Sequence, residues 1–203
     1  MQVIPIKPHE AHPWILKKHY AKRLPQIMYA FGLYENGELL GVVTYGIPAS
    51  PMLCLGICGK EYANNVLELN RLCLLNNGKN QSSFLVSKSI KLLPKPTIVV
   101  SYADTAQGHI GYVYQATNFL FTGTTKERTD MSNGEGKHSR HGKDPNIRQF
   151  RSAKHRYVYF HGDKRQKKEL LSKLNYSIGA YPKGESSRYD SGDAVATQGL
   201  LNL

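Results

Sequence analysis

Short hydrophobic segments separated by polar turns predict a chain that alternates between strands and helices. Residues 66–75 (VLELNRLCLL) and 97–102 (TIVVSY) have the composition and length of buried strands. The segment between them, residues 80–93, has the periodicity of a helix whose inward face carries Leu85, Val86, Ser89, Ile90, Leu92 and Leu93. This spacing predicts two parallel strands joined by a crossover helix. Ligands of open α/β sheets bind at the carboxyl ends of such strands, where we expect the functional site.

The first part of the chain predicts a strand, a helix and a hairpin. Residues 1–7 form the strand, and Pro5 favours a sheet edge because it cannot donate to a ladder. Residues 8–20 follow as a helix, and we expect Pro13 to reset its start. Two β-rich runs, 28–34 and 39–45, then flank Asn36-Gly37, which is the strongest short signal for a hairpin turn. Residues 46–65 are predicted to be irregular and to pack over a site.

The remaining segments complete an α/β pattern. We expect a helix at 108–118, a strand at 119–125, a strand at 157–160, a helix at 163–174 and a loosely ordered tail from Tyr181. The length of 203 residues fits one domain, which we place at 1–180, with a basic insertion at about 126–156 and the tail at 181–203.

Composition excludes several classes of protein. Hydrophobic residues make up 40% and charged residues 21%, and no apolar run is long enough to span a bilayer, so we expect no membrane association. The first residues lack the pattern of a signal peptide, which predicts a cytoplasmic location. Three cysteines are too few for a disulfide framework, and we interpret them as reduced thiols in the core.

The strongest compositional feature is a net charge of +12, with 27 Lys and Arg against 15 Asp and Glu. Such a surplus is typical of proteins that bind a polyanion, and nucleic acid is the partner we expect, which the resemblance given below narrows to double-stranded DNA; a merely solvated basic surface is the alternative. Basic residues concentrate between 126 and 168. The candidate DNA-binding residues are Lys126, Arg128, Lys137, Arg140, Lys143, Arg148, Arg151, Lys154 and Arg156.

Polar residues within and after the predicted strands are the candidates for chemistry. Glu68 and Arg71 interrupt the first strand, and a bulge between Asn70 and Arg71 would bring them to one site. Asp104 closes the second strand, and we expect His109 and Tyr114 near the same strand end. His19 and Tyr20 have two interpretations, either partly buried residues at a helix end or a base and a phenol near a cleft.

The connection at 76–83 leads into the predicted crossover helix, with Asn80 or Ser82 as its N-cap. Backbone amides at a helix start bind phosphate oxygens readily, and Lys79 would add positive charge at the same point. Every capped helix begins in a similar way, so this pattern has a purely structural interpretation too.

Taken together, ELNRLCL (68–74), the Ser-rich helix start at 80–83, SYAD (101–104) and GHIGYVYQATNFLFTG (108–123) resemble the Mom family of phage DNA-modification proteins. That family is related to the GCN5-type N-acyltransferases. The resemblance covers roughly residues 15–125 and is specific, as a combination of motifs, over 66–123.

The resemblance implies a fold like that of the GCN5-related N-acyltransferases (GNAT), with a central mixed, twisted sheet flanked by helices. It also implies an enzyme that converts adenine in DNA to N6-carbamoylmethyladenine and so protects the DNA from restriction. Acetyl-CoA or another acyl-CoA is the cofactor it implies. The residues that would hold it are Leu72, Leu74, Leu75, Asn80, Gln81, Ser82, Ser83 and Asn118, although only Gly78 stands where acyltransferases have a glycine-rich turn.

Mom-like proteins are also associated with iron, for which His19, Tyr20 and Asp104 are the residues to test. The adenine amine is a poor nucleophile because its lone pair is delocalised. We therefore expect Asp104 or His19 to accept a proton and Arg71 to stabilise negative charge on a donor carbonyl. Tyr45 and Tyr114 would stack on the base or hydrogen-bond to it, and the nucleotide would have to be flipped out of the duplex.

Two other functions fit the same sequence. A conventional acyl-CoA-dependent N-acyltransferase that acts on a protein or a small amine would share the fold. A non-catalytic nucleic-acid-binding protein would explain the charge, but gives no reason for Glu68, Arg71, Asp104 and His109 to converge. The oligomeric state stays open, with a homodimer among the alternatives.

Overall fold

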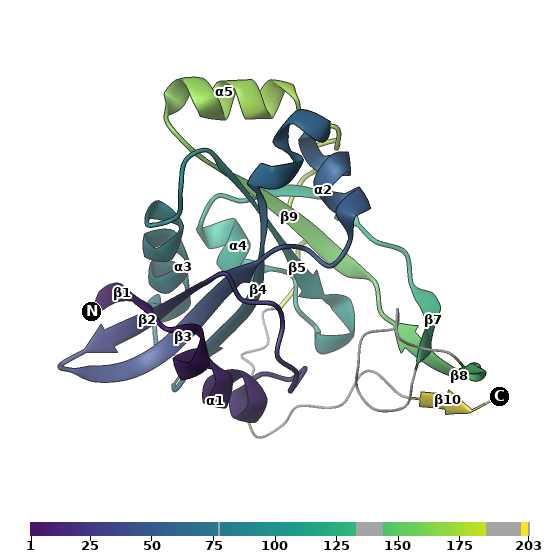
Figure 1. The fold of residues 1–203 in the computed structure, drawn as a ribbon, viewed down its shortest axis with the longest axis horizontal. Helices are drawn as coiled ribbons and strands as arrows, with labels where there is room; N and C mark the ends of the chain where they lie inside the picture. Colours follow the sequence, from purple (N-terminus) through teal and green to yellow (C-terminus); the bar gives the residue numbers. More distant parts are fainter. Residues whose placement is uncertain (77, 133–143, 186–199, 203) are drawn as a thin grey trace.

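The computed structural model describes residues 1–76, 78–132, 144–185 and 200–202 (Figure 1). Its main feature is a seven-stranded mixed sheet in the order β1-β2-β3-β4-β5-β9-β6. The strands are β1 (Gln2–Ile6), β2 (Tyr29–Glu35), β3 (Glu38–Gly46), β4 (Val66–Leu74), β5 (Thr97–Asp104), β6 (Leu120–Thr124) and β9 (Lys154–His161). The helices are α1 (Pro8–Lys18), α2 (Pro51–Cys58), α3 (Gln81–Lys91), α4 (Tyr112–Ala116) and α5 (Lys164–Ser172), with 3-10 turns η1 (Lys60–Asn65) and η2 (Thr105–Gln107). The expected α/β class, with a central mixed sheet and flanking helices, is confirmed.

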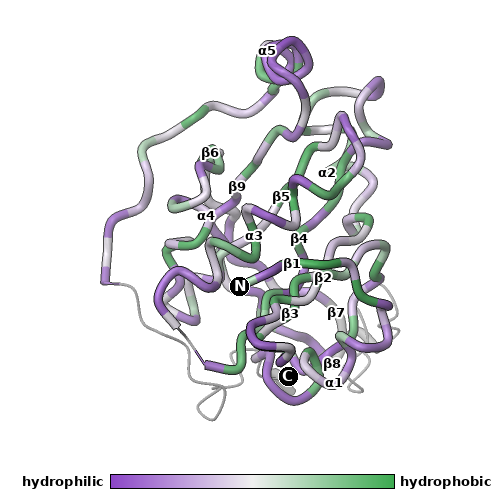
Figure 2. The backbone as a smooth tube through the Cα atoms, turned by 90° about the vertical axis from the view of Figure 1, so that its left-hand side faces the viewer, coloured by the Kyte–Doolittle hydropathy of each residue, from purple (hydrophilic) through white to green (hydrophobic). Residues whose placement is uncertain are grey.

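Alternation along the strands sends side chains to two cores, one on each face of the sheet. On one face, Val43, Val99 and Tyr157 pack against Leu85 and the rest of the inward side of α3. On the other face, α1 covers one half of the sheet, while α2 and α5 cover the half that contains β5 and β9. The central strands are the hydrophobic part of the chain, whereas α5 on the outside is largely hydrophilic (Figure 2).

The predicted strand, crossover helix and strand are present as β4, α3 and β5, and β4 pairs in parallel with β5. The inward face of α3 is confirmed for Leu85, Val86, Ser89 and Ile90. The prediction that Leu92 lies on that face is wrong. It lies at the end of the helix and is 50% exposed, because the chain leaves the helical repeat there.

The predicted hairpin is also confirmed. Asn36 and Gly37 have φ values of 51° and 84°, which is the positive-φ pair that a tight turn between β2 and β3 requires. The first strand lies at the edge of the sheet, as Pro5 indicated. Helix α1, however, begins at Pro8 and runs through Pro13. The helical bond that Pro13 cannot make would go to the carbonyl of His9, an exposed residue that water can reach.

The segment 46–65 is not irregular, as predicted, but folds into α2 and η1. Ser50 accepts a hydrogen bond from Leu53 N, Pro51 occupies the first helical turn, and Gly59 ends the helix with a φ of 85°. The buried face of α2 consists of Cys54, Ile57 and Cys58, and both cysteines are free thiols. The Ser-Pro start and the glycine stop were the sequence signals for it.

The basic insertion contains two further strands, β7 (Arg128–Ser132) and β8 (Asp144–Arg151), which pair as a hairpin. A third strand, β10 (Leu200–Asn202), pairs with β8. The predicted tail falls largely on residues outside the described part of the chain. Where it is described, Tyr181 Oη donates to Phe119 O at 2.7 Å and Pro182 O accepts from Gln115 Nε2 at 3.2 Å, so these residues pack on the body.

The last helix is close to its prediction, as Leu170 is buried in α5. The sequence of this helix also favours Leu171 on the inward face, next to Leu170, but Leu171 is 47% exposed because it lies one residue further around the helix. Among the described residues no helix has both the length and the apolar character needed to cross a bilayer.

Gly111, immediately before α4, gives the first test of the fold. Its φ is 81°, and a Cβ there would overlap the buried ring of Tyr157. Gly37 has a similar φ of 84° but open space around it. We expect Gly37→Ala to lower the free energy of unfolding by about 1–2 kcal/mol, the cost of an alanine at positive φ. Gly111→Ala should cost about 2–5 kcal/mol, because overpacking adds to the same term.

Urea denaturation of both variants measures this difference. Equal losses for the two glycines would show that the ring of Tyr157 moves aside at little cost. Such a result would also contradict the interpretation that the start of α4 packs tightly against β9.

Candidate active site

A cavity of about 680 Å³ opens where β4 and β5 separate. The two strands pair only from Val66–Ile98 to Glu68–Val100, although β4 continues to Leu74 and β5 to Asp104. Beyond Glu68 the edge of β4 that faces β5 carries no ladder bonds, and residues 68–75 of β4 and its end line the cavity. The remaining walls come from the loop after α1, the start of α3, residues 108–114, and Arg151 and Lys154.

A bulge at Asn70 turns the polar side chains of β4 toward this cavity. Thr44 pairs with Arg71 and Tyr45 with Leu69, so Asn70 is the extra residue, as predicted. Its side chain fixes the bulge, since Asn70 Oδ1 accepts from Thr44 Oγ1 at 2.6 Å and Asn70 Nδ2 donates to Gln26 O at 3.0 Å. Without the bulge, alternation would place Glu68 and Arg71 on opposite faces, but here both line the cavity.

Glu68 is the one acidic residue among the described residues that line the cavity. Burial raises the pKa of this carboxyl above its usual value, and the positive charges of Arg71 and Lys154 act in the opposite direction. A carboxylate with a raised pKa, held close to two cations, is well suited to accept a proton from a substrate.

Arg71 lies beside it on the β4 wall. Arg71 Nη1 donates to Asn70 O at 2.5 Å and Nη2 to Arg23 O at 3.0 Å, which ties the loop after α1 to β4. Its Nε is buried and has no hydrogen-bond partner within the described structure. Burial lowers the pKa of the guanidinium, while Tyr20 and Glu68 raise it.

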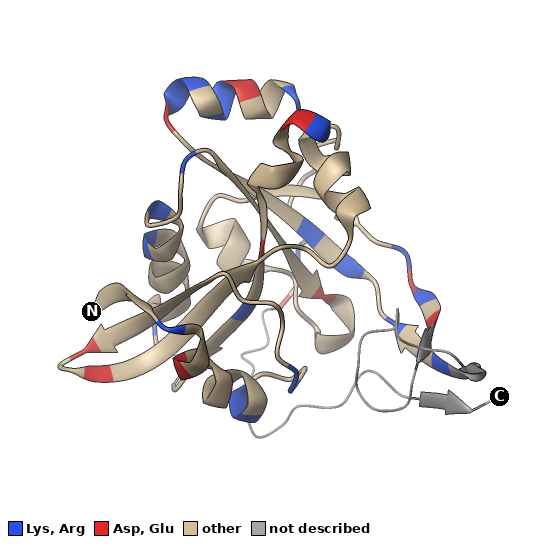
Figure 3. Cartoon of the chain, viewed as in Figure 1, with Lys and Arg blue, Asp and Glu red and all other residues tan. Residues whose placement is uncertain are grey.

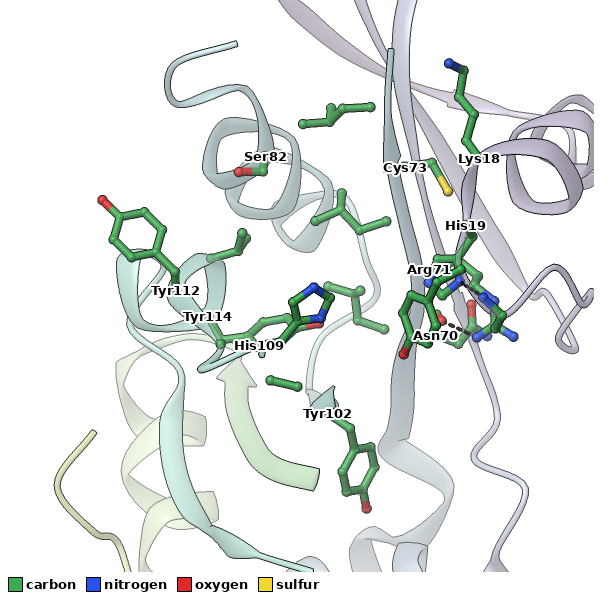
Figure 4. Close-up of a pocket in the computed structure, with 18 of the residues that line it drawn as sticks. Lys18, His19, Asn70, Arg71, Cys73, Ser82, Tyr102, His109, Tyr112 and Tyr114 are labelled. Atoms are coloured by element: carbon green, nitrogen blue, oxygen red, sulfur yellow. Dashed lines mark hydrogen bonds between the residues drawn. The ribbon is translucent and has the colours of Figure 1, made fainter. Parts of the chain in front are cut away.

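His19, Tyr20 and His109 form a row of aromatic rings along the cavity. The rings of His19 and Tyr20 stack at 4.4 Å, and Tyr20 meets His109 edge to face at 6.1 Å. Of the two interpretations of His19 and Tyr20, the structure supports the one that places them at a cleft. Figure 4 shows His109 between the wall that carries Tyr114 and the wall that carries His19 and Arg71.

The structure argues against His19 as the proton acceptor. Its Nδ1 accepts a hydrogen bond from Ala21 N at 3.1 Å, so in the neutral ring Nε2 carries the proton and donates. Burial, together with the positive charge of Arg71, lowers the pKa of His19 to about 3. The ring is therefore neutral at physiological pH and presents a donor.

Asp104 also differs from its predicted role as a base. It is 1% exposed, forms an ion pair with Lys154, accepts from Ser152 Oγ at 2.5 Å and from Ala106 N at 3.1 Å, and does not line the cavity. Its carboxylate is thus fully engaged behind the wall, where it fixes Lys154. Lys154, predicted as a DNA contact, reaches the cavity instead.

The two tyrosines proposed to contact a base are placed differently. Tyr114 lines the cavity, its Oη lies 2.7 Å from Ser101 Oγ, and burial raises its pKa to about 12. Tyr45 is fully buried against α3, with its Oη 2.7 Å from Ser89 Oγ. A ring enclosed in the core cannot stack on a base, so the prediction for Tyr45 is wrong.

The residues expected to hold the cofactor are also divided. Leu72, Leu74, Leu75, Asn80 and Ser82 line the cavity together with Gly78 and Lys79. Asn80 is the N-cap of α3 by position, in the left-handed conformation and without a side-chain capping bond. Gln81, Ser83 and Asn118 do not line the cavity: Gln81 Oε1 accepts from Gly78 N, Ser83 Oγ donates to Asn80 O, and Asn118 has a φ of 60° in the turn before β6.

The residues predicted to contact DNA also differ in where the structure places them. Lys126 and Arg128 are exposed near the β7–β8 hairpin, and Lys and Arg recur along β9 and this hairpin (Figure 3). Arg156 is half-buried, and its guanidinium donates to Thr122 Oγ1 and Thr122 O and stacks at 3.5 Å on Tyr176, so its DNA contact stays a prediction. Arg148 is described, with a buried Nε that has no partner. Lys137, Arg140 and Lys143 lie outside the described residues.

The cavity-lining residues that sequence reasoning missed include Lys18, Arg23 and Tyr102. Arg23 and Lys18 flank the predicted pair His19 and Tyr20, and Tyr102 lies two residues before Asp104 on the same face of β5. Proximity to the predicted residues was therefore the available signal. Burial raises the pKa of Tyr102.

The iron site expected from His19, Tyr20 and Asp104 does not fit this geometry. The Nδ1 of His19 and both oxygens of Asp104 already have hydrogen-bond or ion-pair partners. Within the described ranges, no group of three or more His, Cys, Asp or Glu residues is placed to hold a metal ion.

Comparisons with known proteins agree with the resemblance seen in the sequence. The family model of the Mom protein family matches residues 1–183. The Methylcarbamoylase mom of Escherichia phage Mu is 28% identical over 190 residues, which cover 83% of this chain and 78% of that protein. Among solved structures, the chain is similar to an N-acetyltransferase from Staphylococcus aureus Mu50 (17% identity, TM-score 0.46, 78% of this chain and 97% of that one). It is also similar to an acetyltransferase of the GNAT family from Streptococcus pneumoniae (11% identity, TM-score 0.46, 79% and 99%).

The neutral, buried state of His19 predicts a pH-dependent stability. Its folded pKa of about 3 lies below the unfolded value of 6.5, so the ring takes up a proton on unfolding. Stability is therefore lost as the pH falls from about 6.5 toward 3. We expect the wild type to lose on the order of 1–2 kcal/mol more than His19→Gln between pH 7 and pH 5.

Urea denaturation at several pH values measures this difference. His9→Gln, which changes an exposed histidine of α1, serves as the control and should follow the wild type. A His19→Gln curve parallel to that of the wild type would show that His19 is not held neutral in the folded state.

Proposed function

The chain belongs to the Mom protein family, and on this basis we propose that it is a DNA-modifying transferase that converts adenine to N6-carbamoylmethyladenine. The observation that carries the proposal is a single cavity in which a half-buried carboxylate, Glu68, shares the lining with aromatic rings and with basic residues. The name of the phage Mu relative, a methylcarbamoylase, supports the same class of modification.

Glu68 is the residue we assign to proton acceptance. The exocyclic amine of adenine must lose a proton as it forms a bond to carbon, and a carboxylate with a raised pKa accepts it more readily than an exposed one. Arg71, on the same wall, is positioned to stabilise negative charge that develops on the donor. Asp104 acts indirectly, because it orients Lys154.

The row formed by His19, Tyr20 and His109 is the surface we assign to the base. Aromatic faces stack on any base, and the donor nitrogen of His19 offers a hydrogen bond to a ring nitrogen. The site is recessed, so the adenine has to leave the duplex to reach it, as in other enzymes that modify bases.

The opposite part of the cavity fits an acyl-CoA. The edge of β4 that leaves the ladder with β5 after Glu68 could offer backbone groups to the amides of a pantetheine. The start of α3, with Lys79 and Ser82, would receive the phosphates. Once bound, an acyl-CoA would supply an activated acyl group, with the thiol of coenzyme A as the leaving group. The carbamoylmethyl product joins N6 to a CH2 carbon and carries an amide nitrogen, so its formation would also need a nitrogen donor and an oxidant. Tyr114 Oη lies on the wall between the two parts, where it can donate a proton to a leaving group.

Double-stranded DNA would lie along the β7–β8 hairpin and the adjoining part of β9. Lys126 and Arg128 are exposed there, whereas Arg151 and Lys154 continue the basic path into the cavity. This continuity of charge favours DNA over a small amine as the acceptor, because a small amine needs no basic surface outside the site.

Replacement of the proposed base tests the assignment. Glu68→Gln should reduce modification by about a hundredfold or more while DNA affinity is retained, because general base catalysis contributes on that scale. Mass spectrometry of nucleosides from host DNA after expression measures the product. Glu61→Gln, an exposed residue of η1, is the matched control and should modify DNA as the wild type does.

Two results would contradict the proposal. Wild-type expression that leaves every adenine unmodified would exclude DNA modification, and acetyl transfer to a small amine without DNA would then favour a conventional N-acyltransferase. Full activity of Glu68→Gln would remove Glu68 from the mechanism.

The donor end is tested by a charge placed at the start of α3. Ser82 lines the cavity and Ser83, its neighbour in the same turn, does not. A glutamate in the first turn stabilises a helix, so neither substitution should unfold the protein. Ser82→Glu should weaken coenzyme A binding by about tenfold or more through repulsion of its phosphates, whereas Ser83→Glu should have little effect.

Isothermal titration calorimetry with coenzyme A measures both affinities. An unchanged affinity for Ser82→Glu would place the phosphates elsewhere. Equal losses in the two variants would indicate a long-range effect of charge rather than a contact at Ser82.

A further inference from the structure

Three arginines from distant parts of the chain meet at one side of the cavity. Arg23 lies in the loop after α1, Arg71 in β4 and Arg151 at the end of β8, and all three line the cavity. Arg71 Nη2 donates to Arg23 O at 3.0 Å, so the first two are in direct contact. Burial lowers the pKa of Arg23, and the nearby positive charges of Arg71 and Arg151 lower it further.

The described residues balance only part of this charge. Asp130 pairs with Arg151 and Asp104 pairs with Lys154, which leaves Glu68 as the acid that shares the described lining with Arg23 and Arg71. Arg71 Nε is buried and has no hydrogen-bond partner among the described residues. Arg151 Nε is paired with Asp130 Oδ2 at 3.3 Å, and Arg151 also lines the cavity. Half-buried like charges repel, and a bound anion is what removes that cost.

We propose that Arg23, Arg71 and Arg151 form a subsite for the phosphodiester of the nucleotide whose base enters the cavity. The proposal rests on the proposed function, and it specifies where the protein holds the backbone beside the target adenine. Planar guanidinium groups match the geometry of a phosphate and bind it through paired hydrogen bonds.

The position of the subsite favours a DNA phosphate over the phosphates of the donor. Ser82, at the start of α3, lies across the cavity from Arg71 in Figure 4, so the two anion sites are separate. Tyr20 stacks beside His19 and faces His109, which places an aromatic surface next to the arginines. An aromatic surface beside a cluster of guanidinium groups is the complement of a base and its own phosphate.

The β7–β8 hairpin supplies a matched pair of residues. Arg128 and Arg151 face each other in the register of the hairpin, and both are ion-paired with Asp130. The side chain of Arg128 is 69% exposed and does not line the cavity, whereas that of Arg151 is 13% exposed and does. The two residues therefore differ in access to the cavity but not in charge or partner.

The experiment measures DNA binding by fluorescence anisotropy without a donor. A short duplex carries its central adenine opposite an abasic site, which lowers the cost of extrusion and fixes the register. Neutral methylphosphonates replace the phosphodiesters around that adenine one at a time. We expect one position to weaken binding by the wild type about tenfold, the loss of a hydrogen-bonded charge contact.

Arg151→Gln should bind the all-phosphodiester duplex about tenfold more weakly than the wild type does, and the methylphosphonate at the sensitive position should weaken its binding no further. For Arg128→Gln, the same methylphosphonate should still weaken binding about tenfold. A penalty that persists in Arg151→Gln at every position, or a wild type insensitive to every methylphosphonate, would overturn the subsite. Weaker coenzyme A binding by Arg151→Gln with the methylphosphonate penalty intact would assign the arginines to the donor instead.

The outcome is separable from that of the proposed function. Nucleoside mass spectrometry reports whether adenine is modified, while the coupling of Arg151 to one phosphodiester is measured without any reaction. Unmodified adenine would therefore contradict the proposed function, whereas the phosphodiester subsite would still be tested by the binding data alone.

Discussion

The separation of β4 from β5 beyond Glu68 is the constraint on which the site depends. A parallel pair normally continues its ladder along both strands, but here six residues of β4 extend past the last paired position, from Leu69 to Leu74. Two carbonyls of this segment have side-chain partners, since Leu69 O accepts from Ser101 Oγ and Asn70 O accepts from Arg71 Nη1. A ligand or water in the cavity can pair with other backbone groups of this edge that the ladder leaves without a partner. The bulge at Asn70 contributes to the same site, because it turns Arg71 toward the space between the separated strands. The hydrogen bonds of Asn70 to Thr44 and Gln26 hold the bulge in place.

Buried charge follows from this opening. Inside a continuous sheet, Glu68 and Arg71 would be costly, because each ion would lose its water without a good partner. At the cavity they stay close to each other and to the space where substrate charges would lie. Asp104 solves a related problem on the neighbouring strand. It is fully buried, yet the ion pair with Lys154 and the hydrogen bond from Ser152 satisfy it, so that it holds a lysine at the wall while remaining outside the cavity itself.

The sequence predicted the strand, helix and strand centre, the Asn36-Gly37 hairpin and the bulge in β4, because hydrophobic periodicity and turn chemistry are local. It also predicted that Glu68, Arg71, Asp104 and His109 converge, since they lie in or near the ends of strands that were expected to be adjacent. Glu68, Arg71 and His109 do line one cavity, whereas Asp104 lies behind its wall. It failed where the answer depends on packing at a distance. Nothing near Tyr45 indicates that Ser89 of α3 covers it, and nothing near Asp104 indicates that Lys154, fifty residues later, engages its carboxylate. Arg151 looked like one basic residue among many until the hairpin register placed it in the cavity.

The opposing influences on Glu68 link the two parts of the proposed mechanism. Burial raises the pKa of this carboxyl, and the cations Arg71 and Lys154 hold the rise back. An anion bound to the arginines would neutralise part of that positive field, and the pKa of Glu68 would rise further while the field weakened. A stronger proton acceptor would therefore exist only when the backbone of the target nucleotide is in place. The arginines around Glu68 would then have two effects. They would bind the DNA backbone, and in the absence of DNA they would keep Glu68 a weak proton acceptor.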